Sequence, residues 1–394
     1  MRRPRSLLIT STLLALALIA SACGDANGDG DGGGDDGGEE AADDGGDDDG
    51  GDDGGDADAG GADEGMELVL FDGQWESLWI LNEIFTVIAE DGYGHTVDAP
   101  TTSTAVMMES MPEGEMHVAT EFWCMNIPDW CEEEAFPDDS SVEYSGVVYD
   151  DAVQGIFVPR YVIEGDEEEG IDPVAPDLES VEDLEGLGEV FEDPESPGDG
   201  VFYGGIDGWE STEIQRYKLN AYGLADEYNF TSAGSGSAFD AAVVAALEDK
   251  EPILFYYWTP AWIPGVYDLV QLEEPEWNED CQAATDEALD DEVDASEVSE
   301  EVGCAQPSGE VGIGGWSGLE DEAPEVLELL RAMDGFGIDT MNELTAHMEL
   351  EEVEPDEAAL YFYEEYGDMW RGWLDDDDVI ARVEDGLRER GADV

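Results

Sequence analysis

The sequence predicts an α/β protein whose folded part is divided into two lobes. From Glu67 to Phe122, apolar strand-like runs alternate with helix-like runs, which is typical of a parallel sheet with right-handed crossovers. About 330 residues of globular composition follow residue 65, enough for two domains of ordinary size. Extended segments near residues 157 and 268 are the predicted crossings between the lobes.

The helix predicted over 76–89 has apolar residues at helical spacing, and the glycines around Tyr93 end it. The apolar positions are Leu78, Leu81, Ile84, Phe85 and Ile88. Strands are expected at 67–71, 96–97 and 116–122, with a short helix at 102–111.

An extended strand within 147–162 is expected to lead into the second lobe. The elements expected beyond it are a short helix at 178–187 in an acidic loop, a strand at 200–206, helices at 212–222 and 235–247, a buried strand from Ile253, and a returning strand at 267–272. An acidic insertion follows at 277–309, and then come helices at 323–333, 339–348 and 356–374 and a last helix to about residue 388. We therefore assign 66–157 plus 268–394 to the first lobe and 158–267 to the second.

The chain is extremely acidic. Its 394 residues include 104 Asp and Glu against 12 Lys and Arg, for a formal charge of −92. Such a charge repels itself at low salt and is screened at molar salt, where the Debye length is about 3 Å. We expect a surface adapted to high salt, and we do not expect nucleic acid or an anionic membrane surface as a partner.

The first 22 residues are typical of an export signal, with Arg2, Arg3 and Arg5 before an apolar stretch from Leu7 to Ala20. The small residues before Cys23 resemble a bacterial lipobox, which implies cleavage before Cys23 and lipidation of its thiol. Residues 24–65 contain only Gly, Asp, Ala, Glu and one Asn, so a disordered acidic linker is expected at 23–65. The sequence thus predicts an exported protein, lipid-anchored on the outer face of the cytoplasmic membrane.

Four cysteines remain for an oxidising compartment, which suggests two disulfides. Local pairing of Cys124 with Cys131 and of Cys281 with Cys304 is the simplest of the three possible connectivities. A metal site is not expected, because none of the three histidines lies near a cysteine pair in the sequence. No cofactor is expected.

Three predicted loops carry a Trp at the end of a strand, namely Trp123, Trp209 and Trp258. Each alone is as well explained by core packing, but three at equivalent positions suggest a shared site. Indole faces attract cations, and a quaternary ammonium makes no conventional hydrogen bonds, so aromatic faces suit it. The free N–H groups of the helix that begins at Glu210 and Ser211 could bind a carboxylate. Together these features fit a betaine-like zwitterion.

The stretch 66–374 resembles the substrate-binding proteins of glycine betaine/proline betaine ABC importers. The matching motifs are Glu121-Phe122-Trp123, Gly208-Trp209 and the Tyr257-Trp258-Thr259-Pro260-Ala261-Trp262 run followed by 267–270. The resemblance implies a two-lobed periplasmic-binding-protein fold of type II-like topology with a ligand cleft between the lobes. It also implies a cage formed by Trp123, Trp209 and Trp258, and an ABC permease as partner. We expect a monomer.

The sequence departs from the family at one position. Some members place a His four residues after the first cage Trp, and this chain has Ile127 there. The ligand carboxylate is then expected on the backbone of Glu210 and Ser211, or the ligand lacks one, as choline does. Further cage candidates, for which packing is an equal explanation, are Trp75, Tyr257 and Trp262.

Two other functional classes compete with this interpretation. An enzyme is not expected, because the chain has no phosphate loop, Gly-x-Ser-x-Gly elbow or metal cluster, although carboxylate pairs are abundant. An acidic surface or calcium-binding protein is the other alternative. The leading interpretation is a receptor for glycine betaine or a related quaternary ammonium osmolyte, with choline and carnitine as alternative ligands.

Overall fold

The computed structural model describes residues 65–137 and 139–394, which belong to one compact unit. The predicted signal peptide, Cys23 and most of the acidic linker lie outside the described residues. No helix in the described part of the chain combines the length and the apolar character that a membrane span needs.

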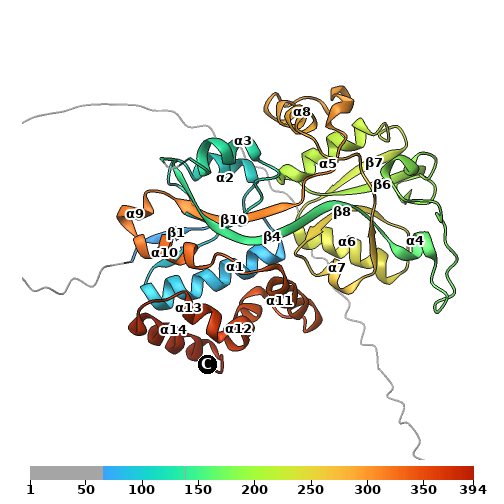
Figure 1. The fold of residues 1–394 in the computed structure, drawn as a ribbon. Helices are drawn as coiled ribbons and strands as arrows, with labels where there is room; N and C mark the ends of the chain where they lie inside the picture. Colours follow the sequence, from blue (N-terminus) through green and yellow to red (C-terminus); the bar gives the residue numbers. More distant parts are fainter. Residues whose placement is uncertain (1–64, 138) are drawn as a thin grey trace, which may run out of the picture. The chain divides into compact units, whose positions relative to one another are not determined.

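The first elements follow the predicted alternation of strands and helices (Figure 1). Strand β1 (Glu67–Val69) pairs in parallel with β2 (Thr96–Asp98), and Leu70 bridges Val118 in parallel at the start of β3 (Val118–Phe122). The expected parallel arrangement is thus confirmed for this unit. Helix α1 (Glu76–Val87) and the π-helical turn that follows it end at Gly94, which has φ +84°, and α2 is Thr104–Ser110.

The larger sheet is mixed. Its order is β3-β10-β4-β8-β6-β5, with β7 paired to β6 and β9 paired to β4. The strands are β4 (Val142–Pro159), β5 (Glu192–Asp193), β6 (Ser196–Ile206), β7 (Tyr228–Ala233), β8 (Leu254–Thr259), β9 (Leu269–Gln271) and β10 (Gly309–Trp316). The sequence missed β5, β7 and β10. Glycine disfavours a strand on propensity, yet Gly312 of β10 leaves the space that the ring of Tyr144 occupies.

Strand β4 joins the two halves of the structure (Figure 1). Its first part pairs with β10 and its last part, from Val153 to Phe157, pairs with β8. The strand was expected to extend within 147–162, but it ends at Pro159. There Arg160 opens the short helix α4 (Arg160–Glu164), in which its side chain pairs with Glu164 and also with Asp268. The expected helix at 178–187 is only a short 3₁₀ turn at Val181–Leu184.

The hydrophobic interior divides into separate cores, consistent with two lobes. One core lies between α1, β10 and the C-terminal helices, and another lies around β6, β8 and the helices beside them. The helices of the second core are α5 (Glu210–Ala221), α6 (Gly236–Glu248) and α7 (Ile263–Val266). The C-terminal helices are α9 (Leu319–Glu322), α10 (Pro324–Ala332), α11 (Ile338–Leu350), α12 (Pro355–Glu365), α13 (Gly367–Gly372) and α14 (Asp377–Arg390).

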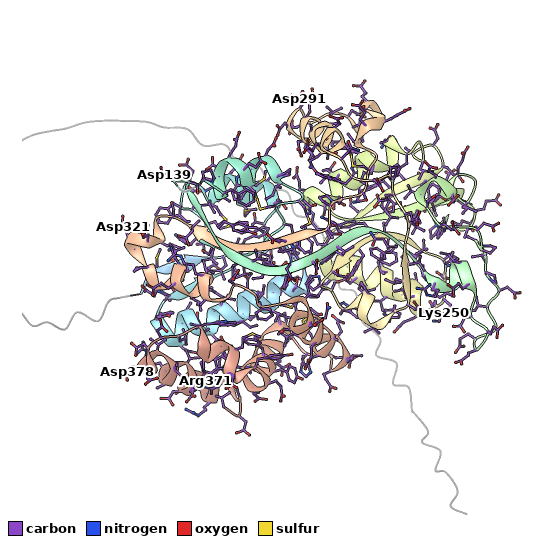
Figure 2. The ribbon with its side chains drawn as sticks, in the orientation of Figure 1. Asp139, Lys250, Asp291, Asp321, Arg371 and Asp378 are labelled. Atoms are coloured by element: carbon purple, nitrogen blue, oxygen red, sulfur yellow. A yellow bond between two sulfur atoms is a disulfide. The ribbon has the colours of Figure 1, made fainter. Side chains whose placement is uncertain are left out.

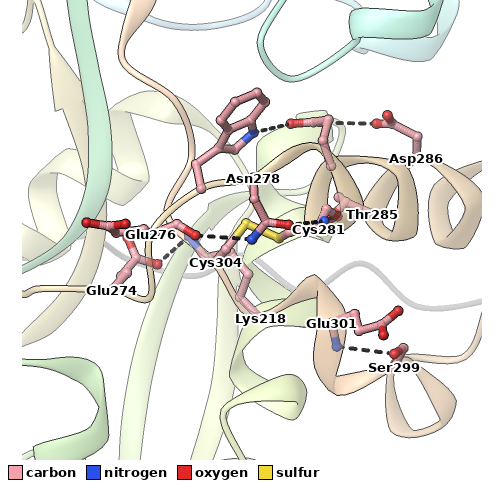
Figure 3. The surroundings of a disulfide bond; sticks show 12 residues. Lys218, Glu274, Glu276, Asn278, Cys281, Thr285, Asp286, Ser299, Glu301 and Cys304 are labelled. Atoms are coloured by element: carbon pink, nitrogen blue, oxygen red, sulfur yellow. Dashed lines mark hydrogen bonds and ion pairs between the residues drawn. A yellow bond between two sulfur atoms is a disulfide. The ribbon is translucent and has the colours of Figure 1, made fainter.

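The acidic insertion packs against the second lobe rather than the first. Its helix α8 (Glu279–Asp290) lies on α5, where the Tyr217 hydroxyl donates to the carbonyl of Ala288 at 3.2 Å. Lys218 of α5 forms an ion pair with Glu274, close to the disulfide Cys281–Cys304 (Figure 3). We propose that the chain returns to the first lobe near residue 306 rather than near 268.

Both expected disulfides are present, Cys124–Cys131 and Cys281–Cys304, so the simplest connectivity is confirmed. Acidic side chains such as Asp139, Asp291, Asp321 and Asp378 project from several separate elements (Figure 2). Cationic side chains among the described residues are few, and several hold the C-terminal helix in place. Arg390 of α14 pairs with Glu90 and Asp91, and Arg371 pairs with Glu384.

Candidate ligand-binding cavity

A cavity lies where residues from the two halves of the structure meet. It contains about 530 Å³ of empty space, including its opening to solvent. The lining residues are Phe71, Trp75, Thr104, Met107, Glu121, Trp123, Asn126, Ile127, Trp209, Glu210, Ser211, Tyr256 and Trp258. The first eight come from the first lobe as assigned from sequence, and the last five come from the second. Closing the two lobes would therefore enclose a ligand on both sides.

Two indoles form a right-angled corner of the cavity. The rings of Trp209 and Trp258 have centroids 5.1 Å apart and an interplanar angle of 89°. Trp258 is held from behind by Tyr257, which stacks on it at 4.5 Å, and Trp209 donates its indole N–H to the carbonyl of Gly73. Both indoles are largely buried, and the bond from Trp209 to Gly73 joins residues assigned to different lobes, so this contact depends on the two lobes being together.

Two further indoles complete the aromatic lining. Trp75 meets Trp209 edge to face, with centroids 6.2 Å apart. The indole N–H groups of Trp75 and Trp123 both donate to Oε2 of Glu121, at 2.7 and 2.9 Å. The Trp123 loop is braced by the disulfide Cys124–Cys131. The cavity therefore presents four indoles that the fold holds by hydrogen bonds or stacking.

Helix α5 begins at the cavity. Its N-cap is Trp209, no side chain caps its first turn, and Glu210 and Ser211 follow immediately. The preceding Gly208 has φ +103°, a conformation that favours glycine, which explains the Gly-Trp pair in the sequence. The first N–H groups of a helix are free donors, so an anionic or polar group of a ligand could be accepted here.

The structure brings most of the predicted site residues together. Trp75, Trp123, Trp209, Glu210, Ser211 and Trp258 all line the cavity. Tyr257 and Trp262 do not. Tyr257 is fully buried behind Trp258 and donates its hydroxyl to Asp240 at 3.0 Å. Trp262 packs against Tyr267 beyond the end of β8. The ring of Tyr257 stacks behind the indole of Trp258 instead of lining the cavity.

Sequence reasoning missed several lining residues, most notably Glu121 and Tyr256. Glu121 lies in β3, where all five residues are buried. The available signal was a carboxylate within a strand whose other residues are suited to burial. The role of Tyr256 depends on a partner from another strand, since its hydroxyl donates to Oε1 of Gln154 on β4 at 2.6 Å.

Amide side chains connect the cavity wall to the crossing segments. Oδ1 of Asn126 accepts from Nε2 of Gln154 on β4 at 2.9 Å, and from Nε2 of Gln306 at 2.7 Å. Gln306 lies just before β10 and also accepts from Gln215 of α5 at 2.6 Å. Because these residues lie on both crossing segments, the network links the cavity to the place where a hinge would bend.

The cavity lining carries acidic groups and no basic side chain. Its carboxylates belong to Glu121 and Glu210. Burial raises the pKa of Glu210, and the neighbouring Glu213 carboxylate raises it further. No group of three or more His, Cys, Asp or Glu suited to a metal ion is found among residues 65–137 and 139–394. The arrangement suits a ligand with a positive charge and can hold it without forming a covalent bond.

A buried pair of carboxyl groups lies close to the cavity. Glu76, in the first turn of α1, faces Asp240 of α6, and both are buried. Burial raises the pKa of Glu76 well above its usual value, and the charge of Asp240 adds to this. Burial also raises the pKa of Asp240, although hydrogen bonds from Glu76 and Tyr257 oppose the rise. The pair therefore favours a shared proton between two elements of different lobes.

Replacing Glu76 by Gln is expected to flatten the pH dependence of the unfolding free energy. The folded protein binds this proton more tightly than the unfolded chain does, so stability falls as pH rises from the ordinary value of 4.5 towards the raised pKa. Urea unfolding at pH 5 and pH 8, at one fixed salt concentration, measures the difference. Exposed Glu185→Gln is the control. Equal pH slopes for wild type and Glu76→Gln would contradict the shared proton.

Comparison with known proteins gives a family-level match. The model of the family described as the substrate binding domain of ABC-type glycine betaine transport system matches residues 67–365. A trimethylamine N-oxide-binding protein of Pelagibacter ubique (strain HTCC1062) is 25% identical over 211 residues, which are 52% of this chain and 62% of that protein. The glycine betaine-binding periplasmic protein OusX of Dickeya dadantii (strain 3937) is 25% identical over 188 residues, 46% of this chain and 53% of OusX. The chain thus spans little more than half the length of these curated relatives.

Solved structures show the same fold at low identity. A glycine betaine/L-proline-binding protein from Borrelia burgdorferi has a TM-score of 0.60 at 18% identity, covering 80% of this chain and 99% of that one. A choline-binding protein in complex with choline also has a TM-score of 0.60, at 17% identity, covering 82% of this chain and 98% of the other. These similarities establish a two-lobed binding-protein fold with a cleft.

Proposed function

This chain belongs to the family of substrate-binding domains of ABC-type glycine betaine transport systems, and from that premise we propose that it binds a small quaternary ammonium compound outside the cytoplasm and delivers it to an ABC permease. Members of this family bind solutes and are not enzymes. We further propose that the protein is a monomer, anchored through a lipid on Cys23 and adapted to high salt.

The observation that carries the proposal is the corner formed by Trp209 and Trp258, with Trp75 and Trp123 completing the lining. Aromatic faces stabilise a desolvated quaternary ammonium by about 0.5–2 kcal/mol each. The ligand would be bound by closure of the two lobes about β4 and the segment before β10. Trp123, Trp209 and Trp258 would contact the ammonium, with Trp75 at the edge and Glu210 and Ser211 near the other end of the ligand.

Two ligand classes fit this cage. One is glycine betaine, the ligand after which the relative OusX is named. It would place its carboxylate at the N-terminus of α5. A ligand without a carboxylate, such as choline, is favoured by a specific observation: Ile127 stands where some family members have a His, and no basic side chain lines the cavity. Trimethylamine N-oxide and carnitine remain ligands to be tested.

Isothermal titration at molar salt tests the proposal. The ligands are glycine betaine, proline betaine, carnitine, choline and trimethylamine N-oxide. High salt keeps the acidic chain compact and screens non-specific attraction of cations. We expect saturable, one-to-one binding of at least one of them. The matched control is the neutral isostere of choline in which carbon replaces the nitrogen, and it should bind much more weakly. Absence of binding for every charged ligand would refute the proposed function.

A further inference from the structure

Glu121 lies beneath two of the cage indoles. It is the next-to-last residue of β3, it is 1% exposed, and it lines the cavity. Oε2 accepts from the indole N–H groups of Trp75 and Trp123, while Oε1 accepts from the hydroxyl of Tyr149 at 3.1 Å. Three donors, two of them distant from Glu121 in the sequence, therefore converge on one buried carboxyl group.

The arrangement of donors suits an ionised carboxylate. An ionised carboxylate only accepts hydrogen bonds, whereas a protonated acid would have to place its own proton among these donors. Burial raises the pKa of Glu121, and the hydrogen bonds from Trp123, Trp75 and Tyr149 oppose that rise. Burying a carboxylate is costly unless it is well hydrogen-bonded. The three donors supply those bonds and so oppose the loss of charge that burial favours.

That charge has two consequences for the cage. Trp75 and Trp123 each have their indole N–H fixed by the same oxygen, so Glu121 sets the orientation of both rings. A carboxylate behind the ring edges also adds negative potential to a cavity that has no basic lining residue. A cation in the cavity would gain from this potential, and a ligand carboxylate would be repelled by it.

We propose that Glu121 is the specificity-determining residue of the cavity, positioning Trp75 and Trp123 and favouring ligands of net positive charge over zwitterions. This inference rests on the proposed function and deepens it. The favoured chemical class is a small quaternary ammonium alcohol without a carboxylate, as in choline.

The test compares the affinities of choline and glycine betaine in wild type and in Glu121→Gln. Gln has nearly the same shape but no charge. We expect choline to weaken at least tenfold in Glu121→Gln, and the ratio of choline affinity to glycine betaine affinity to fall by about tenfold. An equal loss for both ligands, or no loss, would overturn the specificity role.

Two further variants, Glu121→Asp and Tyr149→Phe, distinguish the loss of the charge from a disruption of the cavity structure. Glu121→Asp keeps the charge but shortens the side chain, so both ligands should weaken while their affinity ratio stays within threefold of wild type. Tyr149→Phe removes one donor and leaves the charge and both indole bonds, so the ratio should again be preserved. A tenfold fall of the ratio of choline affinity to glycine betaine affinity in either variant would overturn the proposal. This outcome can be measured even if Glu121→Gln does not fold. If wild type binds neither ligand nor any other in the panel, the proposed function itself fails.

Discussion

Replacing Trp209 by Ala is expected to weaken binding of the quaternary ammonium ligand by at least tenfold, and replacing Trp258 by Ala is expected to do the same. Each indole supplies one wall of the right-angled corner. Truncating a buried aromatic anchor at a binding site often costs 2 kcal/mol or more, which corresponds to about 30-fold in affinity. Titration of the tightest-binding ligand at molar salt measures the change.

Two variants distinguish a role of the indoles in ligand binding from a role in packing alone. Trp209→Phe keeps an aromatic face but loses the hydrogen bond to Gly73, so it should retain more affinity than Trp209→Ala. Trp277→Ala removes an exposed indole that does not line the cavity, and it should leave affinity unchanged. Unchanged affinity in both Trp209→Ala and Trp258→Ala would remove these residues from the site.

Replacing Lys218 by Met is expected to destabilise the protein by about 3–5 kcal/mol, because it leaves the charge of Glu274 buried without its partner. Both side chains of this ion pair are about 1% exposed. Glu274 also accepts from the hydroxyl of Tyr222 at 2.8 Å, and this bond alone does not balance a buried charge. Urea unfolding at fixed salt concentration measures the loss.

The matched control is Lys250→Met. Lys250 is exposed and lies 5.2 Å from the ring centroid of Tyr161, so its replacement should cost less than about 1 kcal/mol. The double variant Lys218→Met with Glu274→Gln removes both charges and should recover much of the stability. If Lys218→Met were no more harmful than Lys250→Met, the buried pair would not be holding the segment after β9 against α5.

The sequence predicted those parts of the fold that depend on local patterns. Helix α1 follows from the apolar spacing that begins at Leu78, and the parallel β1–β2 pairing follows from the alternation of elements. The two disulfides follow from the spacing of the cysteines. In each case the information lies within one or two neighbouring elements.

The parts that the sequence missed depend on long-range packing. Strand β10 is rich in glycine, and its place between β3 and β4 becomes favourable only when the ring of Tyr144 fills the space beside Gly312. The insertion helix α8 packs on the second lobe because of contacts such as that of Tyr217 with Ala288. In both cases the contacting residues, Tyr144 with Gly312 and Tyr217 with Ala288, are far apart in the sequence.

The candidate site was only partly predictable for the same reason. The three indoles of the proposed cage were predicted through motifs, and all three line one cavity in the structure. Glu121 was overlooked, although it lies two residues before Trp123, because its importance depends on Trp75 and Tyr149 from other elements. Tyr257 was a further cage candidate, but its ring stacks behind the indole of Trp258 and its hydroxyl donates to Asp240 of α6, which lies far from it in the sequence.

The most direct test of the account is a crystal structure of the protein with saturating choline or glycine betaine, whichever binds more tightly. We predict the ammonium group in the cavity, with its methyl groups against the faces of Trp123, Trp209 and Trp258. A ligand bound elsewhere on the protein, or in the cavity with its ammonium away from these rings, would contradict the proposed cage.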